Sequence, residues 1–179
     1  MVTQENDTET LNNQINDPAV IWALLEDVYD PEVPVLSIID LGIVRSVQFD
    51  PELYHSTGGW EIIITPTYSG CPAMDVINMM IRLKLVENGI TNFKIRTELS
   101  PAWTTNWMTQ SGKEKLMAYG ISPPSVKLND ALFGITEAIE CPRCRSKNTV
   151  LLSEFGSTAC KALYQCTDCK EPFDYFKCH

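Results

Sequence analysis

Cys141-Pro-Arg-Cys144 is followed, after twenty-one residues, by Cys166-Thr-Asp-Cys169. A Cys-x-x-Cys loop lets two thiolates converge on one metal ion, and two such loops on facing hairpins complete a tetrahedral shell of four sulfur atoms. Four inert or disulfide-bonded cysteines would leave the paired spacing unexplained. The stretch therefore predicts a β-rich four-cysteine ribbon. Zinc is the default metal for such a shell, although iron or an iron-sulfur cluster uses the same ligands.

Three further residues near the ribbon are accessory candidates for metal binding. Cys160 lies in Phe155-Gly-Ser-Thr-Ala-Cys-Lys161, a predicted turn beside the second Cys-x-x-Cys loop, and Cys178 and His179 end the chain. Cys160 either packs on the hairpin or offers an exposed thiol for transient metal binding. The terminal pair is either frayed or a pair of extra ligands.

The length of 179 residues allows one ordinary domain with an appended module. No apolar run reaches the ~18 residues that a membrane span needs. Residues 1–17 are polar and acidic and have neither the basic nor the apolar segment of a targeting signal, so they are interpreted as a disordered acidic tail. Together with cysteines in metal-type spacing, this predicts a cytoplasmic protein with no membrane contact.

The net charge of -9 is unevenly distributed along the chain. Residues 1–131 hold eight Lys/Arg against seventeen Asp/Glu, whereas residues 132–179 hold six of each. An acidic surface repels phosphate backbones, which argues against nucleic-acid binding by the larger part. In the ribbon, only Arg143, Arg145 and Lys147 form a basic cluster, and because zinc ribbons often contact nucleic acid, nucleic-acid binding by the ribbon is a less favoured alternative.

The part of the chain before the ribbon alternates helix and strand patterns. Apolar spacing, β-branched runs and turn residues predict helices at 19–28, 72–88 and 106–119 and strands at 43–49, 60–65 and 92–99. The first two strands read as a hairpin, and the third follows a helix that allows a parallel crossover. The predicted fold class is α/β (α+β): a small, three-layer-like domain with a short mixed sheet and a largely buried central helix, plus the ribbon.

Paired prolines mark a boundary between the two parts. Ile121-Ser-Pro-Pro-Ser-Val-Lys-Leu-Asn-Asp130 has the composition of a semi-rigid spacer. The predicted organisation is a tail at 1–17, an α/β domain at 18–120, a linker at 121–131 and the ribbon at 132–179.

Cys71 is the strongest candidate for chemistry outside the ribbon. It lies in Thr65-Pro-Thr-Tyr-Ser-Gly-Cys-Pro72, between the end of a predicted strand and the start of a predicted helix. Gly70 permits a tight turn there, and Pro72 suits the first helical position. A helix N-terminus favours the thiolate, so we expect a pKa below the value of about 8.5 of a free cysteine. Such a thiolate attacks electrophiles or binds soft metals. The alternative is a small, buried and inert cysteine.

Several enzyme classes lack their motifs in this chain. With only two histidines, a Cys-His hydrolytic dyad is not supported, and no glycine-rich phosphate loop is present. Taken alone, Asp30 and Glu32 read as turn and cap residues. A thiol oxidoreductase would need a resolving cysteine close to Cys71. The sequence therefore favours a protein that is not an enzyme.

Both halves of the chain resemble known families. Residues 18–120 resemble the SufT-like iron-sulfur assembly domain, and the ribbon resembles that of the D proteins of phenylacetyl-CoA epoxidase (ring 1,2-epoxidation) systems in aerobic phenylacetate catabolism. The stretches that carry the resemblance are Asp30-Pro-Glu-Val-Pro34, Ser37-Ile-Ile-Asp-Leu-Gly-Ile-Val44, Thr65 to Pro72, Cys141 to Cys144, Phe155 to Lys161 and Cys166-Thr-Asp-Cys-Lys-Glu-Pro-Phe173.

The resemblance implies a thiol site formed by Asp30, Glu32, Asp40, Thr67 and Cys71. Tyr68 stands where the family often has a second threonine.

The resemblance also implies an accessory maturation factor that assists assembly of an iron-sulfur or di-iron centre, with iron or a cluster held transiently at Cys71. The implied partners are the oxygenase and reductase components of the epoxidase, and a homodimer is a candidate assembly. The alternative is a structural or docking subunit without metal transfer.

Overall fold

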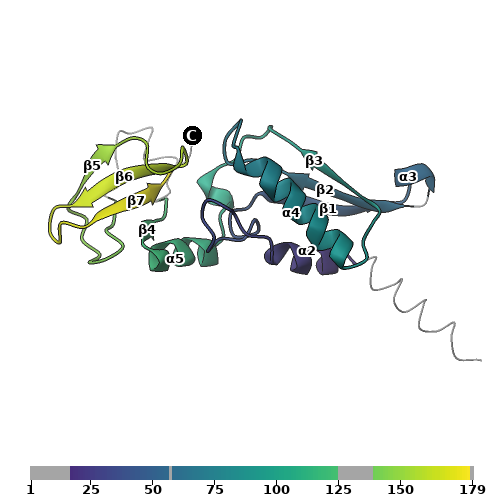
Figure 1. The fold of residues 1–179 in the computed structure, drawn as a ribbon, viewed down its shortest axis with the longest axis horizontal. Coiled ribbons are helices and arrows are strands. Elements are labelled where there is room, and N and C mark those ends of the chain that lie inside the picture. Colours follow the sequence, from purple (N-terminus) through teal and green to yellow (C-terminus); the bar gives the residue numbers. More distant parts are fainter. Residues whose placement is uncertain (1–16, 57, 125–138, 178–179) are drawn as a thin grey trace, which may run out of the picture.

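The computed structural model describes residues 17–56, 58–124 and 139–177. Two sheets lie toward opposite ends of an elongated molecule, with α5 between them (Figure 1). The elements of the larger domain are α2 (Pro18–Glu26), β1 (Val44–Asp50), α3 (Leu53–Ser56), β2 (Gly59–Ile64), α4 (Ala73–Glu87), β3 (Phe93–Thr97), the 3-10 helix η1 (Thr105–Trp107) and α5 (Gln110–Tyr119). Those of the ribbon are β4 (Ile121–Ser122), β5 (Thr149–Ser153), β6 (Lys161–Cys166) and β7 (Pro172–Phe176). No helix within these ranges combines the length and the apolar character that crossing a membrane requires.

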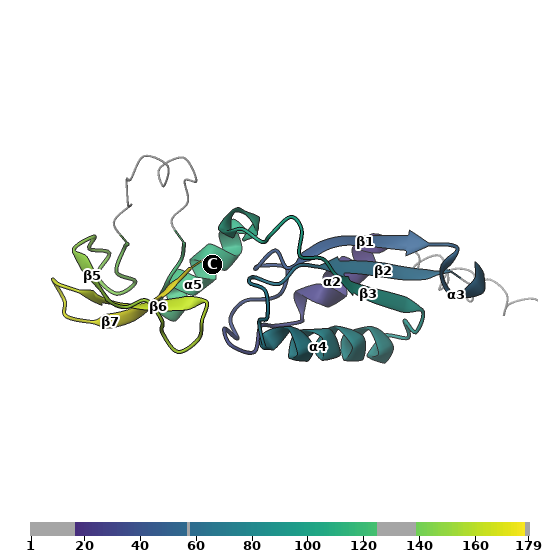
Figure 2. The ribbon, with the colours of Figure 1, turned by 90° about the horizontal axis from the view of Figure 1, so that it is seen from above.

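The larger sheet has the mixed pairing that the sequence predicts. Its order is β1-β2-β3, in which β1 and β2 are antiparallel and β2 and β3 are parallel. The chain returns from β2 to β3 through α4, which lies alongside the sheet (Figure 2). The predicted hairpin, crossover helix and parallel third strand are confirmed.

Helix ends follow the local capping chemistry. The Asp17 side chain accepts a hydrogen bond from the Ala19 N–H at 2.9 Å, with Pro18 in the first helical position of α2. In α5, the Thr109 hydroxyl accepts from the Gly112 N–H at 2.9 Å, and Gly120 ends the helix at a φ of 96°. Asp17-Pro18 and Gly120 lie at helix ends that the sequence predicts, whereas the Thr109 cap starts α5 at Gln110, later than the predicted residue 106.

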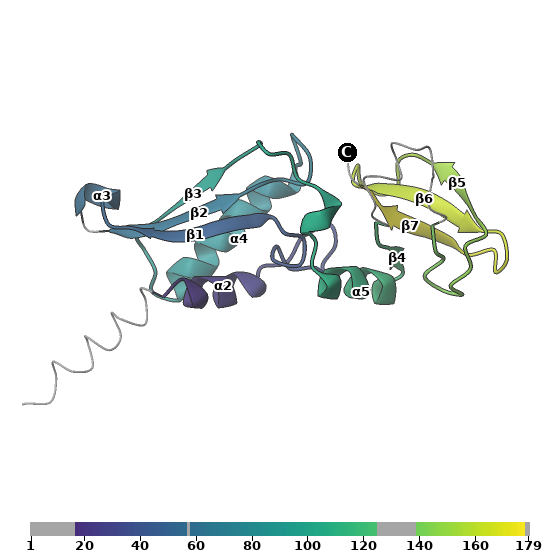
Figure 3. The same cartoon turned by 180° about the vertical axis from the view of Figure 1, so that it is seen from behind.

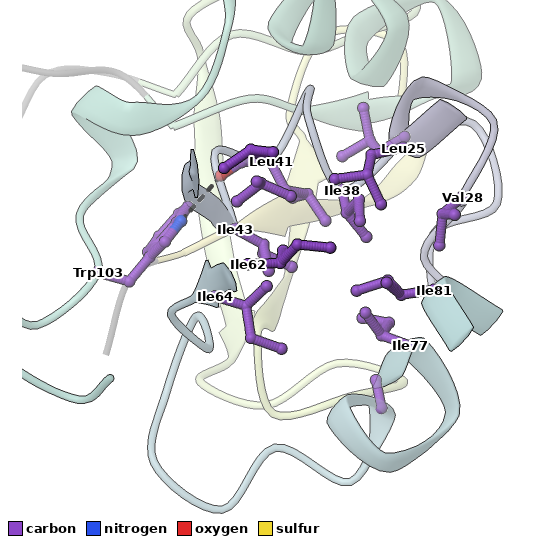
Figure 4. Close-up of a cluster of buried hydrophobic side chains, with 14 of the residues drawn as sticks. Leu25, Val28, Ile38, Leu41, Ile43, Ile62, Ile64, Ile77, Ile81 and Trp103 are labelled. Atoms are coloured by element: carbon purple, nitrogen blue, oxygen red, sulfur yellow. Dashed lines mark hydrogen bonds between the residues drawn. The ribbon is translucent and has the colours of Figure 1, made fainter. Parts of the chain in front are cut away.

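The core lies between one face of the sheet and the two helices α2 and α4, which pack together as Figure 3 shows from behind. Ile77 and Ile81 of α4 lie across from Ile62 and Ile64 of β2 (Figure 4). Each fully buried side chain of this size stabilises the fold by about 1.5–3 kcal/mol relative to an exposed one. The opposite sheet face carries exposed ion pairs of Arg96 with Glu61 and Glu98.

α4 is less buried than its apolar sequence predicts. Its inward positions recur every four residues, but a second apolar row faces outward and is 39–55% exposed. That row consists of Val76, Met79, Leu83 and Val86. The prediction of a largely buried helix is wrong, because only one side of α4 has a layer to pack against.

The ribbon sheet has the order β4-β7-β6-β5. Ile121 and Ser122, which the sequence places in the linker, pair in parallel with Asp174 and Tyr175 of β7. The ribbon sheet therefore takes its edge strand directly after α5. The rest of the predicted linker lies mainly outside the described residues, as do Cys178, His179 and the predicted tail up to residue 16. The domain boundary itself stays a prediction.

The ribbon and the larger domain share one buried cluster. The rings of Trp103 and Phe176 meet edge to face with centroids 6.3 Å apart, and both residues are at most 3% exposed. The Trp103 indole N–H donates to the Leu41 carbonyl at 2.8 Å, as the dashed line in Figure 4 marks. Cys160 belongs to the same cluster. The ribbon is thus packed onto the larger domain at this point.

Asp40 joins the loop before β1 to α5. Its carboxylate accepts hydrogen bonds from the Ser37 N–H at 3.2 Å, the Thr109 hydroxyl at 3.1 Å and the Lys115 ammonium at 2.5 Å. Burial raises the pKa of Asp40, but the Lys115, Ser37 and Thr109 hydrogen bonds outweigh it, and the net pKa is lowered.

Asp40→Asn should lower the free energy of unfolding at neutral pH by about 1–2 kcal/mol, a value that allows for solvent screening of the half-exposed Lys115. Since the folded-state pKa of Asp40 is lowered, its stabilisation is complete above the unfolded pKa of about 3.9. It is lost as the pH falls through the folded-state pKa. Urea unfolding of variant and wild type should therefore differ at neutral pH and converge in acid. Exposed Glu52→Gln serves as the control, and an equal loss in both variants would contradict this role.

Candidate metal centre and cysteine site

The four cysteines of the two Cys-x-x-Cys loops converge in the ribbon. The Sγ atoms of Cys141 and Cys169 are 3.8 Å apart, those of Cys144 and Cys166 are 3.5 Å apart, and all four lie within 4.8 Å of one another. A tetrahedral zinc site with Zn–S bonds of about 2.3 Å has S–S edges of about 3.8 Å. The predicted ligand set therefore converges as a four-sulfur zinc site of the ribbon requires.

The two loops repeat the same backbone arrangement. The N–H of the first cysteine donates to a carbonyl five residues later in each: Cys141 to Ser146 and Cys166 to Glu171, both at 2.9 Å. The residue after the second cysteine, Arg145 or Lys170, has a φ of 64°. The Cys169 and Asp168 N–H groups and neighbouring thiols lower the pKa of Cys166 to about 7. In Cys144 the Ser146 N–H acts in the same direction, but burial and the three other thiols raise the pKa to about 12, so the four thiols share protons that a metal would displace.

Cys71 lies where the sequence places it, immediately before α4. Gly70 has a φ of 83°, which a residue with a side chain rarely adopts, and the Cys71 N–H donates to the Tyr68 carbonyl at 3.3 Å. The Cys71 carbonyl accepts from the Met74 N–H at 3.2 Å, so the turn leads directly into the helix. The thiol is half-buried against the shared core cluster.

The pKa of Cys71 differs from the expectation. Burial raises it, the Ala73 N–H and the Tyr68 hydroxyl lower it, and the charges of Glu32 and Asp30 raise it further, so the net pKa is raised. The prediction of a lowered pKa is wrong because burial, together with the carboxylates of a loop distant in sequence, outweighs the single N–H that the helix start supplies.

That acidic loop is shaped by Asp30. Its buried carboxylate accepts from the N–H groups of Glu32 at 2.7 Å and Val33 at 2.9 Å. Burial raises the pKa of Asp30 despite these bonds and the charge of Lys161. The turn leaves Glu32 partly exposed, and the charge of Glu32 acts on Cys71.

Cys160 of the ribbon lies beside Glu32 of this acidic loop. Its thiol is 3.7 Å from Oε2 of Glu32 and 3.0 Å from the Thr158 hydroxyl, and the residue is 5% exposed. Burial raises the pKa of Cys160 to about 11, with Glu32 and Asp30 contributing. Cys160 is thus buried against the larger domain, a placement that neither sequence alternative anticipated.

Tyr68 also belongs to this cluster. Burial and the neighbouring Cys71, Glu32 and Cys160 raise the pKa of Tyr68 to about 12. The sequence signal that could have identified Tyr68 as a site residue is its position, three residues before Cys71, where the family often has threonine. We call Cys71, Cys160, Glu32, Asp30 and Tyr68 the interdomain cluster.

Two predicted site residues are placed differently. Thr67 is half-buried in the loop that contains Tyr68. Asp40 is held by Ser37, Thr109 and Lys115 and lines a surface pocket between the end of α2 and α5. Whether either acts together with Cys71 stays a prediction.

Cys166→Ser should abolish zinc binding and unfold the ribbon, because binding energy on the order of 10 kcal/mol at a structural zinc site is largely folding energy. Metal analysis and circular dichroism of the purified chain would test this. Cys71→Ser is the matched control and should keep one zinc per chain. A folded ribbon without metal would contradict the assignment.

Two family models match separate parts of the chain. Residues 18–88 match the family model described as "Iron-sulfur cluster assembly protein" and residues 127–177 match "PaaD zinc beta ribbon domain". A "Fe-S protein maturation auxiliary factor" of Porphyromonas gingivalis (strain ATCC BAA-308 / W83) is 31% identical over 97 residues, covering 54% of this chain and 87% of that protein. The crystal structure of a "Domain of Unknown Function DUF59" from Bacillus anthracis, 27% identical, superposes with a TM-score of 0.49 over 55% of this chain and 90% of that chain.

A relative from Escherichia coli (strain K12) matches both parts together. It is named as a putative D subunit of 1,2-phenylacetyl-CoA epoxidase and is 52% identical over 158 residues, covering 88% of this chain and 91% of the relative. The match spans the assembly domain and the zinc ribbon in the same order. The chain therefore belongs to the PaaD family, the D subunits of phenylacetyl-CoA epoxidase, with an iron-sulfur assembly domain followed by a zinc ribbon.

Proposed function

We propose that this chain is a non-catalytic, cytoplasmic maturation factor that helps to load an iron-sulfur or di-iron centre into the oxygenase or reductase component of a phenylacetyl-CoA epoxidase. The observation that carries the proposal is the half-buried Cys71 thiol at the turn that leads into α4, on which the charges of Glu32 and Asp30 act. The names of two relatives support this proposal. One relative is named as a component of the epoxidase, which supports the epoxidase as the protein that receives the centre. The other is named as an Fe-S protein maturation auxiliary factor, which supports iron or an iron-sulfur cluster as the cargo.

The surroundings of Cys71 suit a transient metal ligand. Without cargo, burial and the charges of Glu32 and Asp30 keep the thiol protonated. An iron ion beside it reverses that balance, because a cation stabilises the thiolate and is attracted by the same carboxylates. One thiol with acidic neighbours supplies fewer ligands than the closed four-cysteine shell, which fits a site that releases what it holds.

A docking role without metal transfer is the second candidate function. The observation that favours it is the outward apolar row of α4, formed by Val76, Met79, Leu83 and Val86. Contiguous exposed apolar side chains on one helix face are typical of protein contact surfaces. In this role Cys71 would only help to pack the start of α4.

The two functions differ in their dependence on Cys71. In cells that carry Cys71→Ala as the sole copy, the iron content of the purified oxygenase and reductase components should fall severalfold, since the transfer ligand is lost. Ser69→Ala, an exposed change in the same loop, is the matched control and should leave iron loading intact. Iron per chain of each component is the measured quantity.

Full iron content of the oxygenase and reductase components in Cys71→Ala cells would contradict the maturation role. If that variant also co-purified with the epoxidase components in fixed stoichiometry, the docking function would hold instead.

A further inference from the structure

We infer that two copies of this chain associate through the edge strand β5 of the ribbon, pairing antiparallel so that one continuous sheet runs through both ribbons. The occupant of the edge is thus a second β5. The inference goes beyond the proposed function, because no residue of the Cys71 site takes part in the contact.

β5 (Thr149–Ser153) is the outer strand of the ribbon sheet, whose order is β4-β7-β6-β5. Figure 1 shows it along the outer edge of the ribbon. It pairs with β6 on one side, and in the part of the chain that the structure describes no strand pairs with its other side. Such an edge presents backbone N–H and C=O groups that another strand can bind.

The side chains of β5 are apolar on both faces of this edge. Val150, Leu151 and Leu152 are 44%, 48% and 51% exposed, and successive residues such as Val150 and Leu151 point to opposite faces of a strand. Proteins commonly protect an exposed edge with a charge or a proline inside the strand, and Thr149-Val-Leu-Leu-Ser153 contains neither. The edge therefore suits an uncharged, apolar strand, and a second β5 is such a strand.

A β-bulge limits the length of the contact. The register between β5 and β6 shifts between Leu151 and Ser153, so the regular part of β5 is Thr149–Leu151. A bulge bends its strand and disrupts regular pairing. The contact between copies is therefore short, and small contacts of this kind are weak and reversible. We expect a dissociation constant that is roughly micromolar.

Charges at the two ends of β5 select the antiparallel arrangement. Lys147 precedes the strand and Glu154 follows it; both are exposed, and among the described residues neither has an ion-pair partner. A two-fold axis can set either Val150 or Leu151 opposite its own copy. In both registers Lys147 lies one residue from the position opposite the partner's Glu154, so opposite charges meet at each end. A parallel arrangement would bring like charges together instead.

The larger domains also favour the antiparallel arrangement. Along its strands, one end of the ribbon sheet meets the larger domain through Cys160 and Phe176, and the other end carries the zinc ligand Cys166. Antiparallel pairing of β5 points these ends in opposite directions in the two copies, so the larger domains lie apart. Residues 1–131 hold eight Lys/Arg against seventeen Asp/Glu, so two such domains side by side would repel each other.

Sedimentation equilibrium of the purified full chain, with zinc in the ribbon, tests the inference. Wild type should be monomeric well below a micromolar concentration and largely dimeric at about a hundred micromolar. Leu151→Lys places like charges together at the centre of the contact and should raise the dissociation constant about tenfold or more. Met79→Lys makes the same kind of change in the exposed row of α4 and is the matched control, so it should leave the constant unchanged.

Charge reversal tests the direction of pairing. Lys147→Glu and Glu154→Lys each replace two attractive pairs by two repulsive pairs and should weaken association roughly tenfold. The double variant restores two attractive pairs and should associate as wild type does. In a parallel pair like charges would face like charges in all four chains, so equal association of the four would contradict antiparallel pairing at β5.

Hydrogen exchange of the β5 amides identifies what covers the edge. Protection that rises with the dimer fraction supports the inference. Protection at every concentration in a monomeric chain would overturn it, because the chain's own residues would then cover β5. Protection that appears only when an epoxidase component is added would overturn it as well and assign the edge to a strand of that component.

Two sedimentation results would also overturn the inference. One is a wild-type chain that stays monomeric at several hundred micromolar. The other is a dimer that Met79→Lys dissociates and Leu151→Lys does not, which would assign the contact between copies to α4. Zinc content and circular dichroism of each variant are compared with wild type. Iron loading of the epoxidase is not a readout here, so neither result decides the test of Cys71.

Discussion

The edge-to-face contact between Trp103 and Phe176 is the interaction on which the docking of the ribbon onto the larger domain depends. It joins two sheets that have separate topologies and places the ribbon against the loop that contains Asp30 and Glu32. Buried aromatic pairs contribute both apolar area and a preferred geometry, so the contact sets orientation as well as affinity. Without it, the α/β domain would keep its core and the ribbon its zinc, but Cys160 would have no reason to lie beside Glu32.

The features that the sequence predicts well are those decided within a few residues. The spacing of the four zinc cysteines, Gly70 before Cys71 and the caps at Asp17 and Gly120 act locally, and the structure places all of them as expected. The mixed sheet also follows from the order of its elements.

The features that the sequence could not predict depend on tertiary packing. Cys160 meets Glu32 only because the ribbon docks, and the raised pKa of Cys71 comes from burial and distant carboxylates that outweigh a local N–H. The exposed row of α4 has the same origin, since apolar character along a helix does not reveal whether a second layer exists to cover it. The family resemblance predicts Asp40 as part of the thiol site, whereas its hydrogen bonds in the structure join it to Thr109 at the start of α5 and to Lys115 within that helix.

Strand β6 begins beside Cys160 and ends at Cys166, so one continuous segment connects the interdomain cluster to the zinc shell. A chain that has not yet acquired zinc has nothing to anchor the far end of that strand. Zinc uptake by the ribbon would therefore precede the placement of Cys160 against Glu32, so the contact between the two parts of the chain would form only once the ribbon holds its metal.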